Sequence, residues 1–160
     1  GSNPSFLRPA SGLHLSLSRE SKLSKSFLVD YGINYNQFNN VGDIQNIPFS
    51  YATDFIGIHA GIGPRLSLGK GIALVAKASA SATTMVNGNQ FLLNRYVDLS
   101  SDNQFNSLRT MIGYSFELNK QINPQLGVFA KYQRLDSYNF GSSTLNFIPS
   151  TFSIGLSLSK

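Results

Sequence analysis

The chain has 160 residues, of which 41% are hydrophobic and only 13% are charged, and its net charge is +5. Charged residues are about half as frequent as in an ordinary soluble domain, which indicates that much of the exterior does not face water. The thirteen Lys and Arg residues occur singly and never in runs, which argues against nucleic-acid binding. The absence of Cys excludes disulfides, thiolate metal sites and Cys nucleophiles.

Apolar and polar residues alternate with a period of two through almost the entire chain, which predicts an all-β fold. In the first such segment, GLHLSLS, Leu alternates with His or Ser. The alternation predicts seven strands, at residues 12–18, 26–38, 56–68, 72–84, 107–118, 125–133 and 151–159.

The connections between these segments alternate in length. Short ones lie near residues 20–25, 69–71 and 119–124, and long, polar ones lie near residues 39–50, 85–106 and 137–146. Short turns on one side and long loops on the other are typical of an antiparallel up-and-down barrel.

Two architectures produce this alternation with opposite polarity. A soluble barrel or sandwich points its apolar face inward, whereas a transmembrane barrel points it towards lipid and its polar face into the lumen. Here the polar face is rich in Gly and Ser and poor in Lys and Glu. Such a face suits the crowded interior of a narrow barrel better than a surface bathed in water, so we predict a transmembrane β-barrel of about eight strands.

The few charged residues on the polar face are predicted to form a network inside the lumen, where both signs can pair. By strand parity this network contains His14, Asp30, His59, Arg65, Lys77, Arg109, Glu117 and Lys131. The alternative is that each is an ordinary solvated surface charge.

Strand length and aromatic placement favour the membrane interpretation. The segments approach or exceed the length that a tilted strand needs to cross a bilayer. The apolar face also carries aromatic residues that could form an interfacial girdle, namely Tyr31, Tyr35, Tyr114, Phe116, Tyr132 and Phe152. Aromatic packing in a soluble core is the alternative.

The segments FIGIHAGIGPRLSLGKGIALVAKASASA, MIGYSFELNKQINPQLGVFAKYQ and FSIGLSLS resemble small outer-membrane β-barrel domains of the OmpA/OmpX type. The resemblance implies an eight-stranded barrel in the bacterial outer membrane with short periplasmic turns, and it implies no single activity. Gly1 and Ser2 resemble the remnant of a removed tag. We therefore expect residues 1–10 to be a tag remnant and N-terminal segment, and residues 11–160 to be a single β-barrel domain.

Two features depart from that family. Only seven strands are predicted, so residues 5–10 or residues 90–99 must supply an eighth, or this chain lacks it. The chain also ends in Leu158-Ser159-Lys160 rather than on the terminal aromatic residue that is common in such barrels.

Residues for catalysis are few. His14, Ser16 and Glu20 loosely resemble the His-x-Ser pattern of a lipid A deacylase barrel, but Leu17 follows the Ser where that pattern has Asn. We expect no catalytic residues, no cofactor and no metal site, because the two histidines lie on different strands and no phosphate-binding glycine loop is present.

The resulting hypothesis is a non-enzymatic structural or interaction component of the bacterial envelope with a largely filled lumen. Its predicted partners are membrane lipid or lipopolysaccharide and other envelope proteins, with no nucleic acid. Residues 85–106 form the predicted interaction loop, with Phe91, Leu92, Leu93 and Tyr96 as candidate contacts. The alternatives are a soluble β-barrel that carries an apolar ligand and a barrel enzyme that modifies lipid A.

Overall fold

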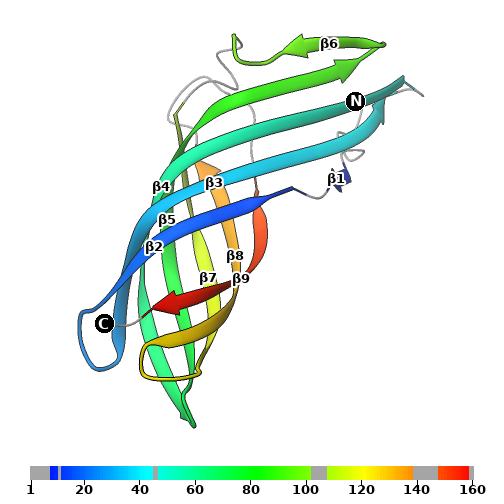
Figure 1. The fold of residues 1–160 in the computed structure, drawn as a ribbon. Coiled ribbons are helices and arrows are strands. Elements are labelled where there is room, and N and C mark those ends of the chain that lie inside the picture. The colour runs from blue at the N-terminus through cyan, green and yellow to red at the C-terminus, as the bar shows by residue number, and fades with distance from the viewer. Residues whose placement is uncertain (1–7, 11, 45–46, 102–107, 139–147, 159–160) are drawn as a thin grey trace.

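A computed structural model describes residues 8–10, 12–44, 47–101, 108–138 and 148–158, which form one antiparallel β-sheet curled into a half-barrel (Figure 1). The strands are β1 (Arg8–Ala10), β2 (His14–Lys22), β3 (Phe27–Ile44), β4 (Ile47–Gly69), β5 (Ile72–Leu92), β6 (Arg95–Asp98), β7 (Arg109–Gln121), β8 (Leu126–Tyr138) and β9 (Ser150–Leu158). No helix in the described part of the chain is long and apolar enough to cross a membrane.

The nine strands occupy seven positions across the sheet. β1 and β2 lie one after the other along the same edge of β3, and β6 and β7 do the same along β5. The order is therefore β1 with β2, then β3, β4, β5, β6 with β7, β8 and β9. Both segments proposed as an eighth strand do contain strand residues, but they extend existing positions and add no new one.

The sequence predicts long loops at residues 39–50, 85–106 and 137–146, and the first two predictions are wrong for the described residues 39–44, 47–50 and 85–98, which form strands and one tight turn. Residues 139–146 of the third lie outside the described residues. β3 and β4 continue as a paired hairpin as far as Ile44 and Ile47, and β5 continues to Leu92 and pairs with β6. Sequence periodicity missed these extensions because the backbone pairing that forms them requires no particular side-chain pattern, and the apolar alternation in these segments is short. Figure 1 shows the extended ends of β3, β4 and β5 bending away from the rest of the sheet, with β6 beside the end of β5.

The opposite ends of the strands are joined by tight connections at residues 23–26, 70–71 and 122–125. Gly69 and Gly71, with φ of 86° and 74°, flank Lys70 in the turn between β4 and β5. Glycine adopts this left-handed conformation without steric cost, so it allows two long strands to reverse within a few residues.

The two faces of the sheet differ in the way that the alternation predicts for a membrane barrel. Apolar residues of alternate parity are exposed on the outer face, while charged and small polar residues are buried on the inner face. At the long-hairpin end the inner face becomes apolar, where Phe55, Met85 and Leu99 form a small core packed against Phe38 and Tyr51. A bulge between Asp54 and Phe55, where β5 carries the additional residue Val86, shifts the alternation so that Gly88 rather than Asn87 is buried after Met85.

Candidate functional site

A cluster of ion pairs on the inner face is the most distinctive polar feature of the described residues. Asp30 on β3, Lys77 on β5, Glu117 on β7 and Lys131 on β8 all have the strand parity that points inward. Lys77 retains only 4% of its surface exposed and Asp30 also retains 4%. A buried charge is costly unless a group of opposite charge lies close to it, so these acidic and basic side chains are expected to pair with one another.

Lys77 is the centre of the cluster. Its Nζ donates a hydrogen bond to Glu20 Oε2 at 3.3 Å and lies 3.5 Å from Asp30 Oδ2 and 3.6 Å from Glu117 Oε2. Asp30 Oδ2 in turn lies 4.0 Å from both Lys131 Nζ and His59 Nε2. One ammonium group thus faces three carboxylates contributed by three other strands.

The structure brings together five of the eight residues assigned to the network by parity: Asp30, His59, Lys77, Glu117 and Lys131. Sequence reasoning missed Glu20, which it had placed in a turn. Glu20 lies on β2 directly opposite Asp30 of β3. Extending the alternation of the first strand by one more residue pair would have placed Glu20 on the inner face.

The other three predicted network residues lie elsewhere on the sheet. His14 pairs through Nδ1 with the side-chain oxygen of Asn36 on β3. Arg65 is half-buried near the short-turn end of β4, opposite Val75. Arg109 is 1% exposed at the start of β7, opposite Thr83.

The predicted interaction residues lie on the β5–β6 hairpin rather than in a loop. The rings of Phe91 and Tyr96, from opposite strands, are 5.0 Å apart between centroids. Leu92 pairs with Arg95, and Leu93 forms the turn with Asn94. Tyr96 is 80% exposed, so this hairpin presents an aromatic surface to its surroundings.

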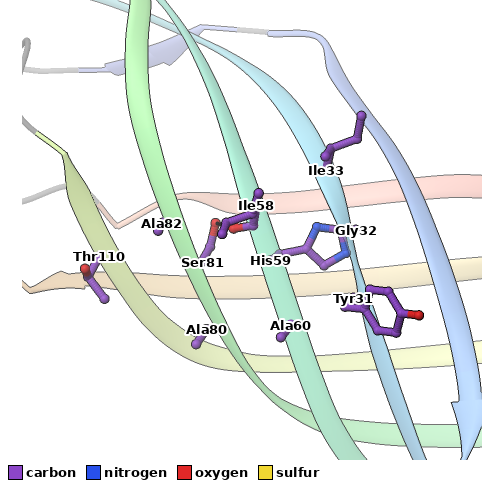
Figure 2. A pocket seen from close by; sticks show the side chains of 10 residues that line it. All are labelled: Tyr31, Gly32, Ile33, Ile58, His59, Ala60, Ala80, Ser81, Ala82 and Thr110. Carbon is purple, nitrogen blue, oxygen red and sulfur yellow. Dashed lines mark hydrogen bonds between the residues drawn. The ribbon is translucent and has the colours of Figure 1, made fainter.

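A shallow apolar depression of about 600 Å³ lies on the outer face across β3, β4, β5 and β7 (Figure 2). Its exposed lining residues have outward parity. Ala60 lies next to Tyr31 of β3 on one side and Ala80 of β5 on the other, and Ala82 lies opposite Ile58. In Figure 2 the three alanines project only a methyl group from their strands, which leaves the depression open.

The residues considered for catalysis and for metal binding lie among the described residues. No group of three or more His, Asp or Glu residues among them is arranged to hold a metal ion. Of the three residues considered for deacylase chemistry, His14 is bonded to Asn36 and Glu20 is bonded to Lys77. Ser16, between them on β2, is exposed at the edge of the sheet.

No protein-family model matches the sequence, and no curated protein matches it. Among solved structures, the crystal structure of Ail, the attachment invasion locus protein of Yersinia pestis, is similar over 92% of this chain and 93% of that chain. The two share 12% identical residues and superpose with a TM-score of 0.41.

Proposed function

We propose that this chain is a β-barrel protein of the bacterial outer membrane that acts as a non-enzymatic structural or interaction component of the envelope. The observation that carries the proposal is the polarity of the sheet. Ile58 is 63% exposed and its strand neighbour His59 is 8% exposed, and the same contrast recurs on the other long strands.

The outer face is apolar over its whole width. Ile33, Ile58, Leu74, Ile112 and Ile154, one from each of β3, β4, β5, β7 and β9, are all exposed. Soluble monomers rarely expose contiguous apolar patches larger than a few hundred Å². A hydrocarbon environment removes this difficulty, because lipid tails solvate such side chains without cost.

An aromatic row supports the same environment. Phe116, Tyr132 and Phe152 are cross-strand partners on β7, β8 and β9, and all three are exposed on the outer face. Aromatic side chains are favoured where hydrocarbon meets lipid headgroups. We assign membrane lipid or lipopolysaccharide as the surroundings of this row.

The interaction role rests on the hairpin tips. The β3–β4 and β5–β6 hairpins extend beyond the apolar outer face, and the latter carries the exposed Tyr96 and Leu93. Other envelope proteins are the partners that we propose for this aromatic surface.

The alternatives fit the geometry less well. A soluble carrier of an apolar ligand needs an apolar interior, whereas the middle of the inner face holds Asp30, Lys77 and Glu117. A lipid A-modifying enzyme needs a nucleophile facing lipid, whereas Ser16 has inward parity.

The membrane proposal is tested by detergent dependence and by one charge placed on the outer face. Extraction should require detergent, and the folded protein should migrate differently from the boiled protein on a gel. Ile58→Asp should block folding into lipid vesicles, because a Lys or Arg facing the middle of a bilayer costs about 2–4 kcal/mol and Asp somewhat less.

Val97→Asp is the matched control. Val97 is also an exposed residue of a strand, but it lies on β6 at the far hairpin. Its substitution should leave insertion intact. A chain that is monodisperse in plain buffer, or that loses insertion equally with both variants, would contradict the proposal.

A further inference from the structure

The two outermost strands of the sheet each have a free edge. Among the described residues, β2 is hydrogen-bonded along its length only to β3, and β9 only to β8. Each free edge is nine residues long. A sheet edge in contact with lipid has no water to satisfy its N–H and C=O groups, so a membrane barrel does not leave edges open.

Strand direction limits how these edges can be closed. Every neighbouring pair in the sheet is antiparallel, and six such reversals separate β2 from β9. β2 and β9 therefore run in the same direction. Joining them directly would require a parallel ladder in a sheet that is otherwise entirely antiparallel.

A second copy of the chain does not solve this problem. If two copies are related by an axis along the barrel, β2 of one meets β9 of the other, and that pair is again parallel. An antiparallel contact between two β2 edges requires one copy to be inverted. Inversion is incompatible with two copies that insert into a membrane in the same orientation.

The side chains along the free edges of β2 and β9 determine which pattern of residues a strand added between them must have. On β9, Phe152, Ile154 and Leu156 are exposed on the outer face, and Ser153, Gly155 and Ser157 alternate with them. On β2, Leu15 and Leu17 alternate in the same way with Ser16 and Ser18. An added strand must continue both patterns, with apolar residues outward and small or polar residues inward.

The ion-pair cluster adds a requirement for charge. Three carboxylates, those of Glu20, Asp30 and Glu117, contact the two ammonium groups of Lys77 and Lys131. The side chain of Glu20, on the edge strand, is 38% exposed, whereas that of Lys77 is 2% exposed. The carboxylates thus outnumber the ammonium groups, and Glu20 is partly exposed on the edge strand. A cation on the inner face of an added strand would pair with Glu20 as well.

We infer that the gap between β2 and β9 binds one extended polypeptide strand that the described residues do not supply, antiparallel to both edges. This strand is about nine residues long, carries apolar side chains outward, and carries a Lys or Arg inward near Glu20. The inference rests on the proposed membrane location. The longest segment of the chain outside the described residues, 139–147, joins β8 to β9 and is therefore committed at both ends.

Engineered disulfides test whether the edges meet directly. The chain contains no Cys, so a variant with two introduced Cys residues has no other thiol that could form a disulfide. Ser16→Cys or Ser18→Cys, each combined with Ser153→Cys or Ser157→Cys, samples four successive parallel registers of β2 against β9. Adjacent strands lie about 4.8 Å apart, whereas edges separated by one strand lie about 10 Å apart, which is beyond the reach of a disulfide. Gln133→Cys with Thr151→Cys, opposite each other on β8 and β9, is the positive control.

A synthetic peptide tests whether the gap accepts a strand. The probe is the sequence of residues 126–134, LGVFAKYQR, which already runs antiparallel to β9 on its other edge and places Lys131 inward. The peptide with Gln133→Cys should cross-link to protein carrying either Ser18→Cys or Thr151→Cys, because the register that puts Lys131 opposite Glu20 puts residue 133 opposite Ser18. The peptide with Gly127→Cys should cross-link to Ser157→Cys instead. A Lys131→Glu peptide should bind about tenfold more weakly, since it brings a like charge to the acidic cluster.

The expected result is no β2–β9 disulfide in the isolated protein together with capture of the peptide at both edges in this orientation. A disulfide between β2 and β9 within one chain overturns the inference in favour of direct closure, and one between two chains overturns it in favour of a dimer. Failure of the peptide to bind also overturns it. Detergent-free solubility would instead refute the membrane location, which the cross-links do not measure.

Discussion

Lys77 shows how a single side chain organises the inner face. Its ammonium group contacts Glu20, Asp30 and Glu117 from three other strands while its side chain is 2% exposed. Removing one partner of a buried ion pair leaves the other uncompensated, which is more costly than replacing the entire pair.

We therefore expect Lys77→Met to lower the free energy of unfolding by about 3–5 kcal/mol. Urea titration of the protein folded in detergent micelles measures this loss. Lys22→Met, an exposed lysine at the end of β2, is the control and should change little. The double variant Lys77→Met with Glu117→Gln should recover part of the loss, and no recovery would contradict the electrostatic explanation.

β4 approaches β5 closely at Gly63. A Cβ added at Gly63 would overlap the backbone carbonyl oxygen of Ala76 and lie 2.7 Å from Lys77 Cα. Backbone atoms cannot move aside as a side chain can, so Gly63→Ala should destabilise the fold by about 1–3 kcal/mol or more.

Gly155→Ala provides the comparison for Gly63→Ala. The Cβ added at Gly155 would meet the ring of Phe129, a side chain that can rotate. Thermal unfolding of both variants in detergent should therefore show the larger loss for Gly63→Ala. Equal losses would show that the backbone contact is not what restricts position 63 to glycine.

Parity assigns residues to one face because the period of a strand is fixed by its geometry. Of the residues assigned to the polar face in this way, Asp30, His59, Lys77, Arg109 and Glu117 are buried. Parity could not show which of these residues touch. Strand tilt and twist bring Lys77 on β5 to Glu20 on β2, three positions away along the sheet, although no pattern along the chain connects them. Glu20 was missed because the exposed polar residues around it resemble a turn.

The β5–β6 hairpin has a turn whose backbone conformation is unusual for its residues. Its turn residues Leu93 and Asn94 both have positive φ, of 51° and 60°. This is the geometry of a type I′ turn, which suits the twist of a hairpin but is unfavourable for a residue such as Leu.

Leu93→Gly should stabilise the hairpin by about 1 kcal/mol, because glycine adopts this conformation without the steric penalty of a Cβ. Hydrogen exchange of the backbone amides of β6 measures the effect as slower exchange. Leu92→Gly, one residue earlier at the end of β5, should have the opposite effect, because Leu92 is a strand residue paired with Arg95. Faster exchange in Leu93→Gly would contradict the strain argument.

The same hairpin carries a pH-sensitive contact. Hydrogen bonds from the backbone N–H of Ser100, at 2.8 Å, and from its side chain lower the pKa of Asp98 below the ordinary value of 3.8. The lowered pKa means that this contact contributes stability above the unfolded pKa, and the contribution is lost as the pH falls through the folded pKa. The NMR shift of the Ser100 amide should therefore titrate with a midpoint below 3.8.

Asp98→Asn should abolish this titration of the Ser100 amide. A midpoint at or above the ordinary value in the unmodified chain would show that the hydrogen bond does not form in solution. The carboxylate of Asp98 would then have no role in fixing the segment that follows β6.

The alternation in the sequence predicted the existence of the main strands but not the residues at which they end. The extension of β4 back to Ile47 begins IPFSYATD, in which the alternation of Ile47, Phe49 and Tyr51 is short and includes Pro48, a residue disfavoured inside strands. Pairing with β3 and β5 provides the hydrogen bonds that stabilise it, and such long-range pairing leaves no local signal.

For the whole molecule, alternation and turn spacing predicted an up-and-down antiparallel sheet, and the structure has one. The number of sheet positions depends on how short strands line up along a common edge. β1 and β6 show this, since each extends an edge already used by a longer strand. The seven positions and the parallel orientation of β2 and β9 follow only once that pairing is known.

The central strands are longer than a strand needs to be to cross a bilayer. β4 has 23 residues, about twice the 9–11 that a tilted strand needs to cross a bilayer. If the chain spans a membrane as proposed, roughly half of β4 stands outside the hydrocarbon as paired backbone rather than as a flexible tether. A ligand that docks on these projecting arms meets a surface whose shape is already set, and it binds without the entropy loss that the ordering of a loop would impose.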